Sequence, residues 1–209
     1  MRALLLLVSA QALAPTRRTF LVAAAGGAAS ASTDGAVREI SLGEAVKAII
    51  TDGNPDWVRA VVQAGFVYRG TPNVRPTLRR DPYDLYSPAT YNSARAATYF
   101  RSLDAALDKS KAPGPRARTA HLAVANAEAA ARWGTAASIW PLGATTYAWG
   151  PTAFWPTRDR AITVAESLRV DEGLADCIRN GGEVLYACEA AVAVPRALEA
   201  SLRAGLGLL

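Results

Sequence analysis

Residues 119–140 read TAHLAVANAEAAARWGTAASIW, and this stretch decides the fold class that the sequence predicts. It begins with a strand, Thr119–Ala125, and Asn126 then caps a helix, Ala127–Trp133, that Gly134 stops. A second strand, Ala137–Trp140, follows. The stretch therefore predicts a strand, a helix and a strand in succession, before a loop rich in glycine, proline and aromatic residues at Pro141–Pro156.

Helices dominate the chain before this stretch. Ser41 and Glu44 form a capping box for a helix from Leu42 to about Ile50. Asp56 can cap a second helix, Trp57–Gln63. The other elements expected there are a polar lead-in at 32–40, a strand at Phe66–Arg69, an irregular loop at Thr71–Pro88 and a helix from about Ser93 to Asp108.

Strands dominate the chain after it. The expected elements are strands at Ala161–Val164, Glu183–Cys188 and Val192–Val194, and helices at Asp171–Asn180 and Arg196–Leu202, the last with Pro195 at its start. A β-α-β rhythm is not sustained. The pattern predicts an α+β fold in a single domain, with helices N-terminal.

Three separated pieces carry a resemblance to a known family. They are Tyr68-Arg69-Gly70 on an early strand, the strand-to-helix passage His121–Trp133, and Glu183-Val184-Leu185 followed by Ala193-Val194-Pro195. Together they resemble the mono-ADP-ribosyltransferase fold, which includes the enzymatic subunits of bacterial toxins. The resemblance spans residues 64–204 and implies a split antiparallel or mixed sheet.

This resemblance implies a site that binds and cleaves NAD. Arg69 would grip a phosphate or ribose of NAD, because a fixed guanidinium binds phosphate oxygens in pairs. Glu183 would be catalytic, since a carboxylate near the anomeric carbon favours an oxocarbenium-like transition state. Gly70 would let the backbone approach the ligand closely. His121 and Asn126 would complete the NAD-binding residues, with no metal.

The sequence departs from the family pattern at two places. Where the family has Ser-Thr-Ser, this chain has Val124-Ala125-Asn126. Gly181 stands where many members place a second acidic or amide residue, although a helix that ends at Asn180 also favours glycine there. Loss of the second residue suggests hydrolysis of NAD, an acceptor other than arginine, or no catalysis.

Each candidate residue also has an ordinary structural interpretation. Arg69 could pair with a carboxylate at the end of a strand, and Glu183 could be a surface residue after a tight turn. His121 could be a half-buried histidine satisfied by the backbone, and Asn126 could be a helix cap only. Aromatic crowding at Trp133, Trp140, Trp149 and Trp155 is typical of a core or a partner interface. The loop residues Arg75, Arg79 and Arg80 could meet an acidic partner or be solvated.

The first 31 residues resemble a cleaved targeting leader. Arg2 precedes a short apolar run, as in a secretory signal that is too short to cross a bilayer. Thr16-Arg17-Arg18-Thr19-Phe20-Leu21, a further apolar run and Ala29-Ser30-Ala31 then resemble a twin-arginine signal. This order is similar to the leader of a thylakoid-lumen protein in an alga with a secondary plastid. The alternative is a bacterial periplasmic protein, and residues 32–209 form the globular domain in both cases.

Composition limits the remaining possibilities. The formal net charge is +5, and Arg2, Arg17 and Arg18 lie in the expected leader, which leaves +2 for residues 32–209 and removes the case for nucleic-acid binding. A transmembrane segment is not expected in residues 32–209. With one histidine and two cysteines, the chain lacks a familiar zinc ligand set. Cys177 and Cys188 could form a disulfide or remain as two buried thiols.

Two functional hypotheses follow. One is an ADP-ribosyltransferase or NAD glycohydrolase in the thylakoid lumen, acting through Arg69 and Glu183. The other is a non-catalytic lumenal protein that docks on a photosynthetic membrane complex through the tryptophan-rich segment 133–155.

Overall fold

Of the two helix caps predicted at the N-terminal end of the domain, the structure confirms the first and corrects the second. In the computed structural model, α1 (Leu42–Asp52) begins with the predicted capping box: the Glu44 amide donates to Ser41 Oγ at 3.1 Å and the Ser41 amide donates to Glu44 Oε2 at 2.8 Å. The cap of α2 (Pro55–Ala64) is Asn54 and not Asp56, because Asn54 Oδ1 accepts from the Trp57 amide at 3.0 Å. Pro55 suits the first helical position, where an amide donor is not needed.

The structure describes residues 37–80, 94–109, 114–117, 119–150 and 165–208. The expected leader and the expected strand Ala161–Val164 lie outside these residues. The described residues all belong to one compact unit, Thr33–Leu209. The remaining helices are α3 (Ala94–Lys109), α4 (Ala127–Ala131), α6 (Leu174–Arg179), the 3-10 turn η2 (Arg196–Leu198) and α7 (Glu199–Gly205).

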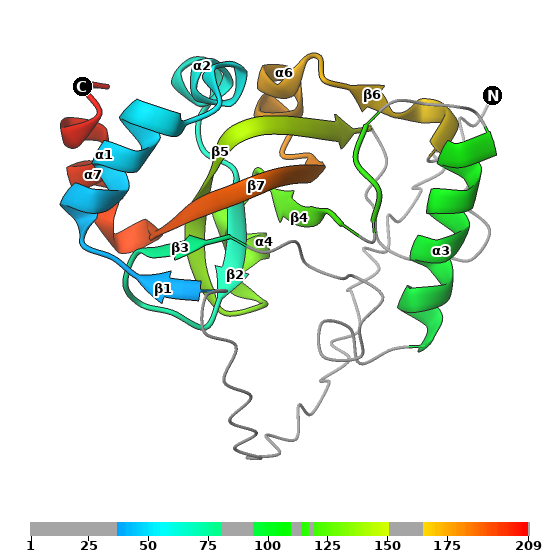
Figure 1. The fold of residues 1–209 in the computed structure, drawn as a ribbon, viewed down its shortest axis with the longest axis horizontal. Helices are drawn as coiled ribbons and strands as arrows, with labels where there is room; N and C mark the ends of the chain where they lie inside the picture. Colours follow the sequence, from blue (N-terminus) through cyan, green and yellow to red (C-terminus); the bar gives the residue numbers. More distant parts are fainter. Residues whose placement is uncertain (1–36, 81–93, 110–113, 118, 151–164, 209) are drawn as a thin grey trace, which may run out of the picture. The chain divides into compact units, whose positions relative to one another are not determined.

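One sheet organises the domain (Figure 1). Its strands are β1 (Val37–Glu39), β2 (Tyr68–Thr71), β3 (Thr77–Arg79), β4 (His121–Val124), β5 (Thr135–Trp149), β6 (Arg169–Val170) and β7 (Glu183–Pro195). They lie in the order β1-β3-β7-β4-β2-β5-β6, with β5 also paired to β7, and all seven pairings are antiparallel. The fold is therefore α+β, as the sequence predicts.

The two long strands were predicted only in pieces. Pro141–Pro156 is expected to be a loop, yet β5 continues to Trp149 through a register shift between Leu142 and Thr145, where Gly143 takes a φ of 70°. Pro141 costs the ladder no hydrogen bond: the Ile139 amide donates to Val67 O, so alternate amide positions point away from β7. β7 likewise joins the two short strands expected at Glu183–Cys188 and Val192–Val194.

The short strands β1 and β3 were missed, because each has only three residues and lies in a segment that reads as loop. β3 pairs with β7, and β1 pairs with β3 through register partners such as Val37 and Arg79. Pairing with a long buried strand supplies the order that their own sequence does not specify.

Strands β7, β4, β2 and β5 close into a ring. Tyr68 on β2 lies opposite Val124 of β4 and also opposite Ser138 of β5. β4 then pairs with the first part of β7, whose other side pairs with β5 along its length. The ring brings β2, β4 and the start of β7 next to one another, so the three segments that carry the family resemblance are neighbours in the sheet.

Two separate groups of buried side chains flank this sheet. The larger, which we call the main core, packs residues of α1, α2, α6 and α7 against the sheet, with Trp57 and Trp140 among its largest fully buried members. The smaller, which we call the annex core, packs α3 through Phe100, Leu103 and Leu107 against Leu185 of β7. In Figure 1, α3 lies at the opposite end of the sheet from α1 and α7.

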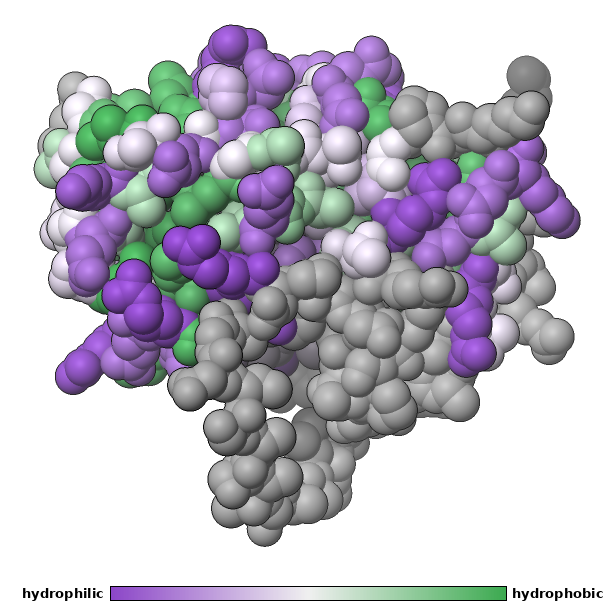
Figure 2. Space-filling model, viewed as in Figure 1, coloured by the Kyte–Doolittle hydropathy of each residue, from purple (hydrophilic) through white to green (hydrophobic). Residues whose placement is uncertain are grey.

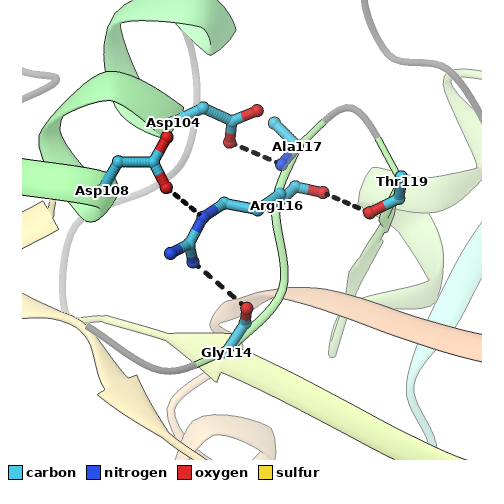
Figure 3. A network of polar contacts seen from close by, with 6 residues as sticks. All are labelled: Asp104, Asp108, Gly114, Arg116, Ala117 and Thr119. Atoms are coloured by element: carbon cyan, nitrogen blue, oxygen red, sulfur yellow. Dashed lines mark hydrogen bonds and ion pairs between the residues drawn. The ribbon is translucent and has the colours of Figure 1, made fainter. Parts of the chain in front are cut away.

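A polar network holds the chain after α3 (Figure 3). Asp104 Oδ1 accepts from the Ala117 amide at 2.7 Å, and Arg116 Nε lies 2.8 Å from Asp108 Oδ1. Arg116 Nη1 also donates to Gly114 O at 3.2 Å. Two carboxylates of α3 thus position the segment that leads into β4.

Candidate functional site

Arg69 lies on β2 with its guanidinium directed at its own chain. Nη1 donates a hydrogen bond of 2.8 Å to Leu122 O, a backbone group of β4, in a partly buried setting. A guanidinium has five donor hydrogens, so this bond uses one of them. Its clearest role is to tie β2 to β4 beyond their single register pair at Tyr68 and Val124.

His121 lies deeper than the half-buried position that the structural interpretation of the sequence assumes. Only 3 % of it is exposed, and its ring stacks on Tyr186, which is its register partner on β7, with 5.0 Å between ring centroids and 17° between planes. Burial, and then the positive charges of Arg69 and Arg79, lower the pKa of His121 to about 3. The ring is therefore neutral at pH 7 and is unsuited to general acid catalysis there.

Gly70 is required by close packing within the chain. A Cβ at this position would come within 2.6 Å of Ala130 O and of the Trp133 carbonyl carbon. The turn that follows α4 thus packs directly against Gly70, where only glycine fits without displacing the backbone.

Asn126 caps α4. Its Oδ1 accepts from the Ala129 amide at 2.9 Å, as the structural interpretation of this residue requires. The cap uses its side-chain oxygen and leaves the amide nitrogen as its remaining donor group.

Glu183 is the first residue of β7 and follows the tight turn after α6. Gly181 takes a φ of 65° and its amide donates to Ile178 O, which is the helix-ending role that the sequence also suggests for it. Glu183 O accepts from Cys177 Sγ at 3.6 Å. Burial, and then the charge of Glu183, raise the pKa of Cys177 to about 12.

The register decides which of these side chains share a face. Val124 of β4 lies opposite Glu183 of β7, and His121, three residues before Val124, lies on the other face of β4 from it. Arg69 of β2 lies opposite Ala137 of β5, which lies opposite Pro195, an even number of residues from Glu183 on β7. The structure therefore separates His121 from Glu183, and the β5 ladder places Arg69 on the side of Glu183 and not on that of His121.

The two cysteines are free in the structure. Cys177 is buried in α6 and Cys188 is partly buried in β7. Burial raises the pKa of Cys188 to about 12 as well. Neither thiol has the lowered pKa of a reactive cysteine.

The tryptophan-rich segment divides between the interior and the surface. Trp140 and Trp149 are 1 % and 5 % exposed and belong to the main core, whereas Trp133 is 64 % exposed. Trp155 lies outside the described residues. Sequence reasoning grouped all four, because it placed Trp149 in a loop and not in β5.

A shallow groove of about 410 Å³ lies between β1 and the start of α1, away from every predicted site residue. Its lining residues are Glu39, Ile40, Ser41, Leu42, Glu44, Arg75, Pro76 and Leu198. Arg75 lies 3.5 Å from Glu39, and the pair is exposed. The groove is built from an ordinary helix cap and surface ion pairs, and it shows no convergence of catalytic groups.

Sequence reasoning did not consider Glu199 at the start of α7. Its Oε1 is buried and has no hydrogen-bond partner among the described residues. The sequence gives no signal for this position, because a glutamate in the first turn of a helix is normally a surface residue.

The described residues lack the side-chain groups of a metal site and a helix that could span a membrane. They contain no group of three or more histidine, cysteine, aspartate or glutamate side chains placed to hold a metal ion. Among them, no helix has the length and apolar character needed to cross a membrane. Comparison with known proteins found no family model, no curated protein and no solved structure that matches this chain.

Proposed function

We propose that the domain is a non-catalytic binding module whose contact surface is formed by two neighbouring loops, Pro72–Arg75 and Arg132–Gly134. We call this surface the tip. The observation that carries the proposal is Trp133, a large aromatic residue that is 64 % exposed. Tryptophan and arginine are the residues that most often dominate binding energy at protein interfaces.

The backbone under Trp133 is tightly packed, which supports a preformed surface. The turn lies against Gly70, and Gly134 lies against Thr71 so closely that a Cβ would come within 2.6 Å of Thr71 O. Thr71 Oγ1 also donates to Asn73 O at 3.2 Å. A surface that is held in place before binding loses less conformational entropy on association.

The composition of the tip favours an acidic protein partner. Val74 is 74 % exposed, and Arg75 and Arg132 are exposed beside it in the same two loops. Exposed apolar side chains in loops that also carry arginines complement a partner surface that is both apolar and acidic. If the expected leader delivers the domain to the thylakoid lumen, the lumenal face of a photosynthetic membrane complex is the partner that we propose.

The NAD-cleaving alternative has weaker support. It needs Arg69 and Glu183 around one ligand, whereas the Arg69 guanidinium donates to Leu122 O of β4 within its own sheet. Gly70 and Asn126 already serve the packing and capping of α4.

The binding proposal is tested by affinity capture from solubilised thylakoid membranes with wild-type protein, Trp133→Ser and Arg132→Ser. Ile50→Ser on α1 is the matched control, since Ile50 is 67 % exposed but belongs to another element. We expect a captured complex to be lost at least tenfold with Trp133→Ser, to weaken with Arg132→Ser and with added salt, and to persist with Ile50→Ser. Equal capture by all four proteins would contradict the proposal.

A parallel assay separates the two functions. The purified protein is incubated with NAD, and nicotinamide release is compared between wild type and Glu183→Gln. We expect no release above background from either protein. Release that depends on Glu183 would restore the enzyme hypothesis in place of the binding module.

A further inference from the structure

The start of α7 holds an acidic side chain in an unusual setting. Glu199 is the first residue of α7 and is only partly exposed, and its Oε1 is buried with no hydrogen-bond partner among the residues that the structure describes. A buried carboxylate oxygen without a partner is costly when the group is ionised, whereas a protonated carboxyl carries no charge to desolvate.

Three ionisable groups act on this carboxyl from the elements around it. Tyr68 approaches from β2, Arg196 from η2 and Arg203 from α7 itself. Tyr68 as a donor and both arginines favour the ionised form, and so does the position at a helix N-terminus. Burial opposes them and is the largest influence, so the pKa of Glu199 is raised above its ordinary value of 4.5.

Of these neighbours, Arg203 also contacts an aromatic ring, and Tyr68 stays neutral. The Arg203 guanidinium lies 4.4 Å from the ring centroid of Phe66, over its face, which keeps it directed toward the main core. Burial, and then the charge of Glu199, raise the pKa of Tyr68 well above that of a free phenol, so Tyr68 stays protonated. Glu199 Oε1 thus lies buried beside these groups without a hydrogen bond from any described residue.

We propose that Glu199 is a proton-sensitive latch for the C-terminal helix: protonated, it lets α7 lie closed on β2 and the main core, and ionised, it draws water to the start of α7 and loosens it. The helix is well placed to respond, because Leu202 is fully buried in the main core. Gly205 is also so close to α1 that a Cβ there would lie 2.8 Å from Val46 Cγ2. A small displacement at Glu199 is thus transmitted to the contact between α7 and α1.

The sign of the effect follows from the raised pKa. Between the ordinary carboxyl value and the raised value, the folded protein holds a proton that the unfolded chain has released. The latch therefore contributes its full stabilisation below pH 4.5 and loses it as the pH rises through the raised pKa. Acidic conditions close α7 and neutral conditions relax it.

The test compares wild type with Glu199→Gln, which copies the shape of the protonated form but cannot ionise. The midpoints of urea unfolding are measured from pH 4 to pH 8. The control is Glu189→Gln, because Glu189 is an exposed glutamate of β7, the strand that precedes η2. We expect the two midpoints to coincide at pH 4 and the Gln variant to exceed wild type increasingly toward pH 8. A midpoint difference that does not change with pH, or one that Glu189→Gln reproduces, would overturn the latch.

A second measurement needs no variant to fold. Carbon NMR of the side-chain carboxyl groups in the wild-type protein should show one glutamate that titrates clearly above 4.5, together with amide exchange in 199–205 that speeds up over the same pH range after correction for intrinsic exchange. Titration of every glutamate at or below the ordinary value would contradict the proposal.

Discussion

The main core and the annex core stand on the same sheet but are closed by different interactions. In the main core, Trp57 packs edge-on against Tyr147 with 6.1 Å between ring centroids, and its Nε1 donates to Ile139 O at 3.0 Å. In the annex core, α3 contributes aliphatic side chains and one phenylalanine, while carboxylates on the same helix hold the following segment. Figure 2 colours the face of the molecule by hydropathy, with apolar residues gathered over α1 and α7 and hydrophilic ones over the exposed side of α3.

This difference indicates two levels of local stability. The main core spans four helices and buries large aromatic groups, so its opening exposes much apolar surface. The annex core is small and depends on polar contacts, of which the ion pair between Arg116 and Asp108 is largely exposed. We expect α3 to open before the rest of the domain, in the manner of a low-stability cooperative unit.

The largest effect is expected from Trp57→Ala. The side chain is fully buried, and its removal should cost about 3–5 kcal/mol of the free energy of unfolding, because both a cavity and an unpaired Ile139 carbonyl result. Urea denaturation followed by circular dichroism measures this loss. Retention of near wild-type stability would show that the main core is not the centre of the fold.

A pH effect on β4, the strand between the two cores, comes next. Because the pKa of His121 is lowered to about 3, the unfolded chain takes up a proton first as the pH falls below 6.5. Stability is therefore lost as the pH falls through this range, by roughly 3 kcal/mol between pH 7 and pH 4 at about 1.4 kcal/mol per pKa unit. Unfolding of wild type and His121→Phe at both pH values checks it, and the variant should lack this part of the acid sensitivity.

Leu103→Ala tests directly whether the annex core opens independently of the main core. The side chain is fully buried in the annex core, and we expect a loss of about 2 kcal/mol, at the low end for such substitutions because a small cluster can collapse around the gap. Amide exchange should accelerate in α3 and residues 114–120 and should stay unchanged in β5 and β7. Uniform acceleration over the whole domain would show instead that the two cores unfold together.

The smallest losses of stability are expected from substitutions of the two carboxylates in Figure 3, and they should differ from each other. Asp104→Ala leaves the buried Ala117 amide without its acceptor and should cost about 1–3 kcal/mol. Asp108→Ala removes a largely exposed ion pair and should cost less than about 1 kcal/mol. Thermal unfolding of the two variants measures the difference, and equal losses would mean that the exposed pair matters as much as the buried bond.

Short-range signals predicted the parts of the fold that depend on a few neighbouring residues. The capping box of Ser41 and Glu44, the Asn126 cap and the Gly181 helix end are all confirmed, because each is fixed by contacts within four residues. Asp56 failed as a cap because α2 begins earlier, at Pro55, where Asn54 accepts from the Trp57 amide. The nearby Asp56 carboxylate pairs with Arg59 instead, at 2.8 Å.

Long-range features were not predictable from the sequence in the same way. β5 passes through Pro141 and Gly143 only because β7 runs beside it, and β1 depends on β3. The candidate site shows the same limit: the order Arg69, His121, Glu183 is visible in the sequence, but the faces that these residues occupy are set by register. The exposure of Trp133, in contrast to Trp140 and Trp149, also depends on where β5 begins.

The arrangement of strands also bears on self-association. The terminal strands of the sheet, β1 and β6, have three and two residues, and they carry Arg38, Glu39 and Arg169. The long strands β5 and β7 each have neighbours on both sides. Exposed strand edges are the usual templates for fibril-like stacking between molecules, and short charged edges suppress it. The short, charged terminal strands therefore disfavour strand-to-strand association between molecules.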